Sequence, residues 1–248
     1  MTSAPLLLSE EDVESGGKSD DSTSIQNDFA YRNNVYNAHI KIRMAFLRKV
    51  YGLISMQLLL TVAIAVVFVV CQPVQYFVHE KPWVIGIPSI ASMVILIALH
   101  CKRKDHPANL ILLCIFTVLQ AFSIGSIVTF FDANVVLEAI FITMAIVIGL
   151  TVYTFQSKRD FSFLGFGLFA GLFALLVGGL VQIYVQSSLM EIAMGIAGAV
   201  LFALFIIYDT HNLMNNLSPE EYILAAINIY LDILNLFLYI LRALAARR

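Results

Sequence analysis

The 248-residue sequence contains few charged residues. Lysine, arginine, aspartate and glutamate together make up only 13% of it, whereas hydrophobic residues make up 60% and the mean hydropathy is +0.85. Soluble domains carry about 25% charged residues, so this composition excludes an ordinary soluble protein. The formal net charge of −2, without a basic and aromatic surface pattern, gives no indication of nucleic-acid binding.

Cysteine is also scarce. Cys71, Cys101 and Cys114 are the only cysteines, and three cannot form a fully paired disulfide framework. In the seven-span arrangement described next, Cys71 and Cys101 lie at opposite faces of the membrane, so they cannot bond to each other. We therefore interpret all three cysteines as structural thiols that behave as small apolar side chains.

Long apolar runs fill most of the chain after residue 40 and predict an all-α membrane protein with seven transmembrane helices. Each run is long enough to cross a hydrocarbon layer of about 30 Å. Residues 1–40 are acidic and rich in small polar side chains, so we expect a disordered cytoplasmic tail, followed by a seven-helix domain over residues 41–248. The expected spans are residues 50–71, 83–101, 108–131, 135–155, 163–185, 189–214 and 222–245.

The basic residues indicate which side of the membrane each loop occupies. They cluster before the first span, after the second and after the fourth, while the alternate loops carry only Lys81 or none. Cytoplasmic loops are enriched in lysine and arginine, so the N-terminus is expected in the cytoplasm. Seven full spans then place Arg242 and Arg248 on the opposite side, against this bias. Six spans with a re-entrant seventh segment would avoid the conflict, but residues 222–245 are long, apolar and free of glycine and proline, which favours seven.

Two aspartates, Asp209 and Asp232, lie in the last two expected spans. A carboxylate inside hydrocarbon is costly and needs a partner or water. The short polar turn between these spans brings both aspartates to comparable depth on antiparallel neighbours, where they can face each other. Two adjacent carboxylates cannot both ionise easily, so such a pair shares a proton, and after losing it the pair can bind a hard cation. We therefore identify Asp209 and Asp232 as a candidate proton- and calcium-sensing pair and as a candidate metal-binding site.

The last span also carries a polar stripe. The residues that share its helix face are Glu221, Asn228, Asp232, Asn235, Tyr239 and Arg242. A polar face in so apolar a protein turns toward other helices or water and not toward lipid. Two interpretations remain open at this point. The stripe is either a dry polar seam that holds the bundle together, or the lining of an ion or proton pathway in which Asn228 and Asn235 flank the aspartate.

Paired aspartates inside a membrane also occur in intramembrane aspartyl proteases, which are the enzyme alternative. Tyr208-Asp209 matches the Tyr-Asp motif of those proteases. Their second aspartate lies in Gly-x-Gly-Asp and they have a Pro-Ala-Leu loop, whereas Asp232 follows Ile229-Tyr230-Leu231 and the chain contains no Pro-Ala-Leu. A seven-span receptor has only the number of spans in its favour. We therefore expect a protein that is not an enzyme and has no cofactor, with calcium as a permeant or bound ion.

Three separated motifs occur in the chain. They are AFLRKVYGLISMQLLLT (residues 45–61), GLTVYTFQSKRDFS (residues 149–162), and the C-terminal IIYDTH and LSPEEYILAAINIYLDILNLFLYILR (within residues 206–242). Together they resemble the transmembrane BAX-inhibitor-motif (lifeguard) family, over about residues 39–244, and point to its Golgi branch. The resemblance implies a BAX-inhibitor-1-like bundle in which the seventh helix is central and the other six enclose it.

The resemblance also implies a function and site residues. The family is associated with pH-sensitive calcium leak from intracellular stores and with suppression of apoptosis, and its di-aspartyl pair matches Asp209 and Asp232. An arginine that latches onto the pair matches Arg103, with Lys102 as the alternative, and an acidic position tied to ion conduction matches Glu220. The expected partners are the lipid bilayer, calcium, protons, and apoptosis regulators or calcium-release channels, in the Golgi and secondarily the endoplasmic reticulum. The alternative function is an anti-apoptotic scaffold that acts through protein partners without conducting ions.

Overall fold

A computed structural model describes residues 40–81, 83–103, 105–157, 159–218 and 221–247 of the chain, with side chains from residue 44 onward. The expected acidic tail, apart from residue 40, lies outside these ranges, as does Glu220. The described residues form eight α-helices and no strands. The helices are α2 (Ile40–Val70), α3 (Gln72–Glu80), α4 (Trp83–Cys101), α5 (Ala108–Val128), α6 (Ala133–Gln156), α7 (Leu164–Val185), α8 (Ser188–Asn215) and α9 (Tyr222–Ala246).

Seven of these helices, all except α3, are long and apolar enough to cross a membrane. This confirms the expected all-α fold with seven spans. The boundaries differ most at α2, which begins at Ile40 and not near residue 50, because lysine, arginine and leucine continue a helix well beyond the edge of an apolar run. The third span also ends earlier than expected, at Val128 in place of residue 131, where Thr129 caps α5.

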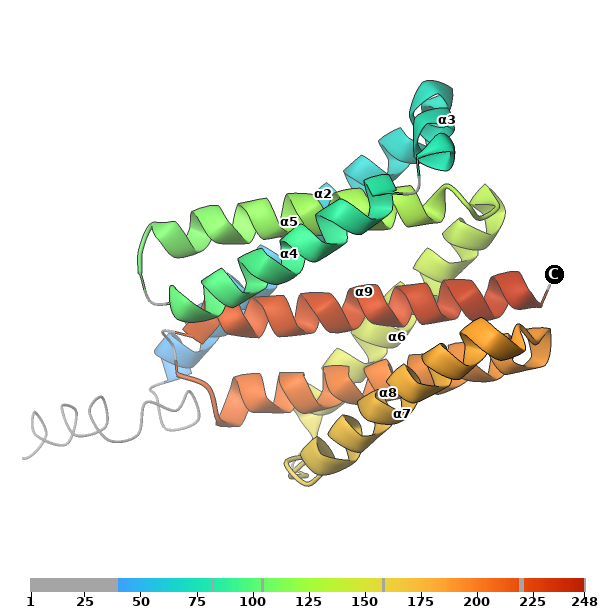
Figure 1. Ribbon diagram of the computed structural model, residues 1–248. Helices are drawn as coiled ribbons and strands as arrows, with labels where there is room; N and C mark the ends of the chain where they lie inside the picture. The colour runs from blue at the N-terminus through green and yellow to red at the C-terminus, as the bar shows by residue number, and fades with distance from the viewer. Residues whose placement is uncertain (1–39, 82, 104, 158, 219–220, 248) are drawn as a thin grey trace, which may run out of the picture.

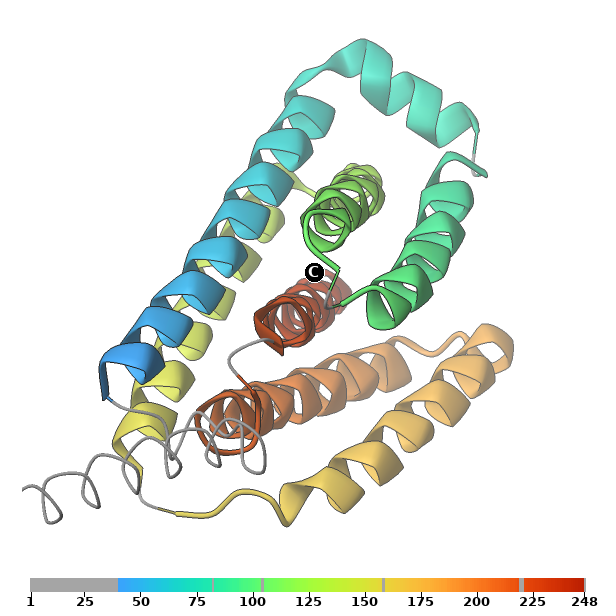
Figure 2. The ribbon, with the colours of Figure 1, turned by 90° about the vertical axis from the view of Figure 1, so that its left-hand side faces the viewer.

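Helix α9 occupies the centre of the bundle. It packs against α8, α6 and α2, and the end-on view shows it enclosed by the other helices (Figure 2). Of the residues in its most apolar stretch, 72% are buried, against 50% in α5 and 22% or less in the other spans. Such burial explains why α9 can carry a polar stripe inside a membrane protein. The central position implied by the family resemblance is confirmed.

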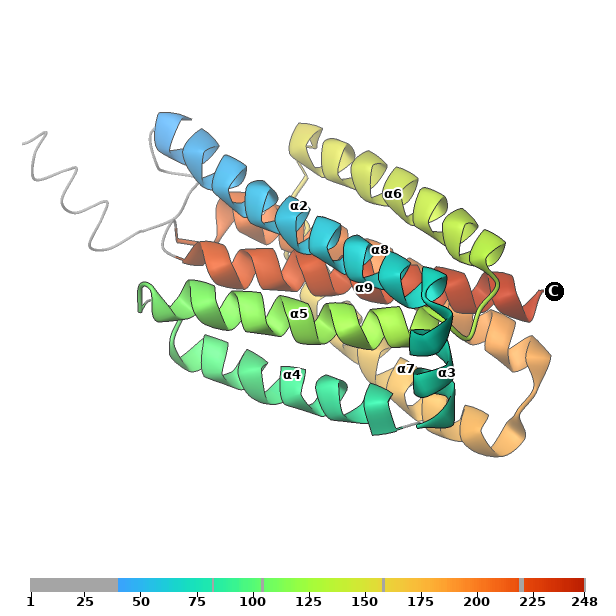
Figure 3. The same cartoon turned by 90° about the horizontal axis from the view of Figure 1, so that it is seen from above.

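The last helix is continuous and traverses the whole bundle. Helix α2 begins at the end where α4 ends and α9 begins, and the C-terminus lies at the opposite end (Figures 1 and 3). This arrangement supports seven full spans and not a re-entrant seventh segment. We call the end with the α8–α9 connection the mouth end and the end with the C-terminus the far end.

Helix α3 was not expected from the sequence. It lies at the far end, after α2, and its nine residues are too few to cross a membrane (Figure 3). Val78 is buried in a small apolar cluster with Phe68 and Val84. The ring nitrogen Nε2 of His79 lies 3.1 Å from the hydroxyl of Thr129, at the end of α5. The short segment between the first two spans is therefore an ordered helix attached to the far end of α5.

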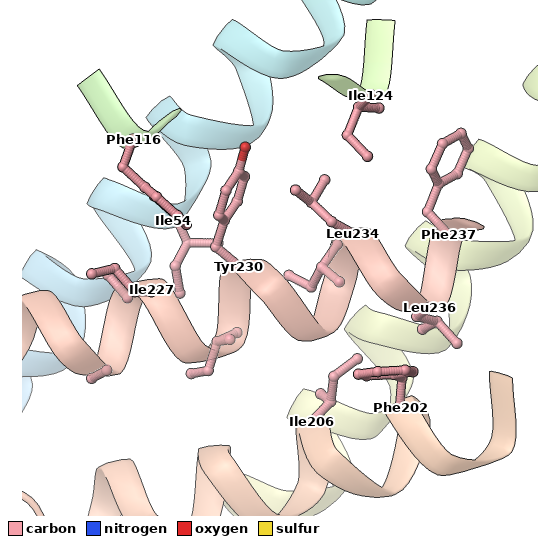
Figure 4. Close-up of a cluster of buried hydrophobic side chains, with 14 of the residues drawn as sticks. Ile54, Phe116, Ile124, Phe202, Ile206, Ile227, Tyr230, Leu234, Leu236 and Phe237 are labelled. Atoms are coloured by element: carbon pink, nitrogen blue, oxygen red, sulfur yellow. The ribbon is translucent and has the colours of Figure 1, made fainter. Parts of the chain in front are cut away.

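Two hydrogen bonds join α9 and α5 to α2 inside the apolar core. The hydroxyls of Thr61 and Tyr230 lie 2.8 Å apart, and Gln57 Nε2 donates to Thr117 Oγ1 at 3.0 Å. Tyr230 is completely buried, and its ring meets Phe116 edge-on at 6.3 Å (Figure 4). Buried polar groups are costly unless they are paired, so these bonds restrict how α2 and α9 can pack.

The three cysteines are free, as expected, and all three are exposed. Cys71 follows α2 and Cys101 ends α4, so α4 separates them. A helix of 19 residues is about 28 Å long at 1.5 Å per residue, which keeps the two thiols at opposite ends of the bundle.

Candidate functional site

The structure brings Asp209 of α8 and Asp232 of α9 together. Their carboxyl groups lie within hydrogen-bonding reach of each other. Asp232 is only 6% exposed, and no N–H or O–H donor among the described residues reaches its buried Oδ2 atom. A buried oxygen without a donor is costly, and a proton shared with Asp209 or a bound cation would satisfy it. The two expected site residues therefore form one carboxyl pair, in which Asp232 is buried and Asp209 is half-buried.

The hairpin that aligns the pair is short. Asn216 and Leu217 both donate their backbone N–H groups to the carbonyl of Asn212 and end α8. The N–H of Glu221 then bonds the Ser218 carbonyl, and α9 begins at Tyr222. Because the connection spans so few residues, α8 and α9 must run antiparallel side by side, which sets the two aspartates opposite each other.

A cavity of about 240 Å³ at the mouth end reaches Asp209, one member of the pair. Its lining residues are Asp209, Asn212, Asn216, Leu217, Ala225 and Asn228. Asn216 Nδ2 donates to Asn212 Oδ1 at 2.8 Å, and Asn212 lies within hydrogen-bonding reach of Asp209. Carboxylate and amide oxygens are the ligands that calcium prefers, so the cavity has the donor chemistry of a hard-cation site.

The expected pathway residues are divided by the pair. Asn228 lines the cavity, whereas Asn235 lies beyond Asp232 toward the far end. The amide of Asn235 is half-buried and donates to the Leu231 carbonyl of its own helix at 2.9 Å. The cavity therefore reaches Asp209 and does not include Asn235.

Arg103 does not contact the carboxyl pair. Its guanidinium NH1 lies 3.2 Å from Glu221 Oε1, at the start of α9, and the side chains are 40% and 21% exposed. The α4–α5 loop that carries Arg103 is held by Asn109, whose amide donates to the Arg103 carbonyl at 3.1 Å. Lys102 is exposed and has no ion-pair partner among the described residues. The basic residue that the resemblance assigns to a latch therefore pairs with Glu221 at the start of α9 and not with the aspartates.

The polar stripe of α9 faces α8 over most of its length. Asp232 meets Asp209, Tyr239 stacks on Phe202, and Arg242 Nε lies 3.6 Å from Glu191 Oε1. Each of these partners belongs to α8. For these three residues the expectation that the stripe turns toward another helix and not toward lipid is confirmed.

A second ion pair near the site was not expected from the sequence. His211, two residues after Asp209, is 7% exposed, and its Nε2 lies 3.5 Å from Asp160 Oδ1 in the α6–α7 loop. The Phe161 ring packs edge-on against the imidazole at 5.7 Å. Hydrogen bonds from Ser162, assisted by His211, hold the pKa of Asp160 below its usual range. This contact fastens the α6–α7 loop to the mouth end of α8, and no spacing in the sequence connects the two residues.

The described residues contain no group of three or more His, Cys, Asp or Glu side chains that could hold a metal ion. A cation at Asp209 and Asp232 would therefore have two carboxylates, with amide and water oxygens completing its coordination. Calcium accepts six to eight oxygen ligands, so this donor set suits a transient site more than a permanent one.

Comparison with known proteins agrees with this arrangement. Residues 43–248 match the family described as inhibitor of apoptosis-promoting Bax1. Protein lifeguard 4 from Mus musculus is 47% identical over 224 residues, which cover 90% of this chain and 94% of the relative. The Golgi anti-apoptotic protein of Vaccinia virus (strain Lister) is 48% identical over 222 residues, with coverage of 90% and 94%. Bax inhibitor 1 from Schizosaccharomyces pombe is 39% identical over 204 residues, with coverage of 82% and 77%.

The family match covers more than four-fifths of the chain, and the first two relatives are similar over nearly their whole length. Both findings agree with the motifs, the seven spans and the central α9. The chain is therefore a multi-pass membrane protein that belongs to the Bax inhibitor (lifeguard) family.

Proposed function

We propose that this protein is a pH-sensitive calcium leak channel of intracellular membranes that lowers store calcium and thereby suppresses apoptosis. The observation that carries the proposal is the carboxyl pair itself, in which Asp209 lines a cavity together with amide side chains and buried Asp232 lies against Asp209. The names of the relatives support an anti-apoptotic role and a Golgi location. In this proposal the protein is not an enzyme, and calcium is the ion that it conducts.

The carboxyl pair supplies the charge that attracts the ion. While Asp209 and Asp232 share a proton, the pair carries one negative charge, and the shared proton occupies the space between the oxygens. Loss of that proton as the pH rises leaves two negative charges on the adjacent carboxylates. A divalent cation then binds between them, and the amide oxygens of Asn212 and Asn228 replace part of its hydration shell.

The ion pair between Arg103 and Glu221, which we call the mouth latch, couples the charge of the carboxyl pair to opening of the channel. We place the mouth end in the cytoplasm, because the basic first turns of α2 and the basic loops after α4 and α6 lie at this end. With the pair protonated, Arg103 rests on Glu221 and the mouth is closed. The second negative charge on the pair competes with Glu221 for the guanidinium, which loosens the α4–α5 loop. Calcium then moves down its gradient along the α8–α9 interface.

The test is calcium flux in liposomes that contain only this protein. Asp209→Asn and Asp232→Asn should each alter the leak and flatten its pH dependence, because either change abolishes proton sharing. Asp132→Asn is the matched control, since Asp132 is an exposed carboxylate at the far end and should leave the leak unchanged. If both pair variants leak with the wild-type pH response, the pathway lies elsewhere. If the wild type itself does not leak, the non-conducting scaffold becomes the better explanation.

A further inference from the structure

Beyond the carboxyl pair, the α8–α9 interface is closed by a close approach of the two helices. The far-end half of α8 presents Gly195 and Gly198 to α9. A Cβ atom on Gly198 would overlap the Tyr239 ring, and one on Gly195 would lie 2.8 Å from the Cβ of Ala243. A larger residue at Gly198 would force the Tyr239 ring to move, and one at Gly195 would press on the backbone of Ala243. The interface here has no room for an ion.

Aromatic rings fill the space next to this contact. The Tyr239 ring lies flat against Gly198 and stacks on Phe202, with centroids 5.6 Å apart and an interplanar angle of 22°. Phe202 is 7% exposed and stacks in turn on Phe205, again at 5.6 Å. In the core, Phe202 lies on α8 below the Leu236 turn of α9 (Figure 4). These offset-stacked rings form a continuous aromatic layer beside the glycine contact.

Tyr239 occupies a particular position on the polar stripe. It follows Asp232 and Asn235 and precedes Arg242, which pairs with Glu191 at the far end. Polar or charged groups therefore lie on both sides of one aromatic layer. An ion that has passed the carboxyl pair meets this layer before it reaches the far-end ion pair. Narrow apolar constrictions of this kind block hydrated ions even where the neighbouring segments are polar.

We propose that Tyr239, stacked on Phe202 and seated on Gly198, is a second constriction of the calcium pathway. This inference rests on the proposed channel function. The constriction acts in series with the Arg103–Glu221 ion pair, the latch at the mouth end. The latch and the carboxyl pair set the pH at which the channel opens. The aromatic layer limits how much calcium passes once the mouth is open, because the ring must leave Gly198 before a hydrated ion can cross. Tyr239 touches neither aspartate in this mechanism, so its removal changes the size of the leak and not its pH midpoint.

The experiment measures calcium flux against pH in liposomes for wild type, Tyr239→Ala, Tyr239→Phe and Leu238→Ala. Tyr239→Ala should raise the maximal leak roughly tenfold, because one aromatic pair shifts the ratio of closed to open channel by about that factor. The pH midpoint of the leak should stay unchanged. Tyr239→Phe keeps the ring and should leak like wild type. Leu238→Ala is the control for lost packing, because Leu238 is a half-buried neighbour off the stripe.

A second variant keeps the test decisive if Tyr239→Ala does not fold. Phe202→Ala removes the other ring of the stack and should raise the leak in the same way. The proposal is overturned if neither variant exceeds Leu238→Ala, or if Tyr239→Phe leaks as strongly as Tyr239→Ala. Those results leave the channel function standing, provided that the wild type leaks and Asp209→Asn alters its pH response. A silent wild type would instead refute the channel function itself.

Discussion

Thiol reactivity along α9 gives a residue-by-residue test of the pathway. The perturbation is a single cysteine at position 228, 229, 235 or 236, in a protein from which the native cysteines have been removed. Asn228 is exposed and lines the cavity, Asn235 is half-buried beyond Asp232, and Ile229 and Leu236 are 1% and 0% exposed. The native cysteines to be replaced are Cys71, Cys101 and Cys114.

The expected rates follow from these environments. A thiolate forms only where water reaches, so a cysteine at Asn228 should react at every pH tested. Cysteines at Ile229 and Leu236 can react only after α9 opens locally, and an opening that costs about 3 kcal/mol slows the reaction by roughly a hundredfold. A cysteine at Asn235 should be protected while the carboxyl pair holds its proton. It should become reactive as the pH rises and the pathway opens.

The assay uses the protein in liposomes, a small water-soluble thiol reagent, and mass spectrometry to follow the added mass over time at a series of pH values. Rates are divided by those of the same cysteine variants in denaturant, which removes the intrinsic effect of pH on thiolate formation. Equal protection of all four positions would mean a dry polar seam and would favour the scaffold. Reaction at 229 and 236 as fast as at 228 would refute the burial of α9 on which this reasoning depends.

Three further predictions concern the fold and the latch. Thr61→Val should destabilise the protein by about 1–3 kcal/mol in unfolding experiments because it leaves the buried Tyr230 hydroxyl unpaired, whereas Tyr230→Phe should cost only about 0.6 kcal/mol; equal losses would contradict the hydrogen bond between them. Arg103→Gln and Glu221→Gln should each raise the liposome leak at the closed pH, and the double variant should leak no more than either single one, because both break the same contact; additive effects would separate the two residues. A protease site after Arg248 should be protected in sealed vesicles while one at the N-terminus is cleaved, and cleavage at both ends would contradict seven full spans.

The amino-acid sequence by itself determined the membrane class and the number and approximate limits of the spans. The thickness of the hydrocarbon layer sets the length of a helix that crosses it, so each uninterrupted apolar run of that length indicates one span. Carboxylates within such runs are conspicuous for the same reason, and Asp209 and Asp232 could be identified and paired through the short turn between their helices. Helix α3 was missed because its nine residues are too few for the span criterion and only Val74 and Val78 form an inward face.

Only the tertiary structure decided which side chains meet. Arg103 reaches Glu221 and not the aspartates, His211 meets Asp160, and Tyr239 lies on Gly198. Helical spacing predicts which residues share a face, but it contains no information on the helix that covers that face or on the depth at which loops from elsewhere in the chain arrive. These quantities depend on helix crossing angles and on the summed packing of all seven spans, in which each contact contributes little. The stripe on α9 was therefore visible in the sequence, while its division into a cavity, a carboxyl pair and an aromatic closure arises from how α8 packs against it.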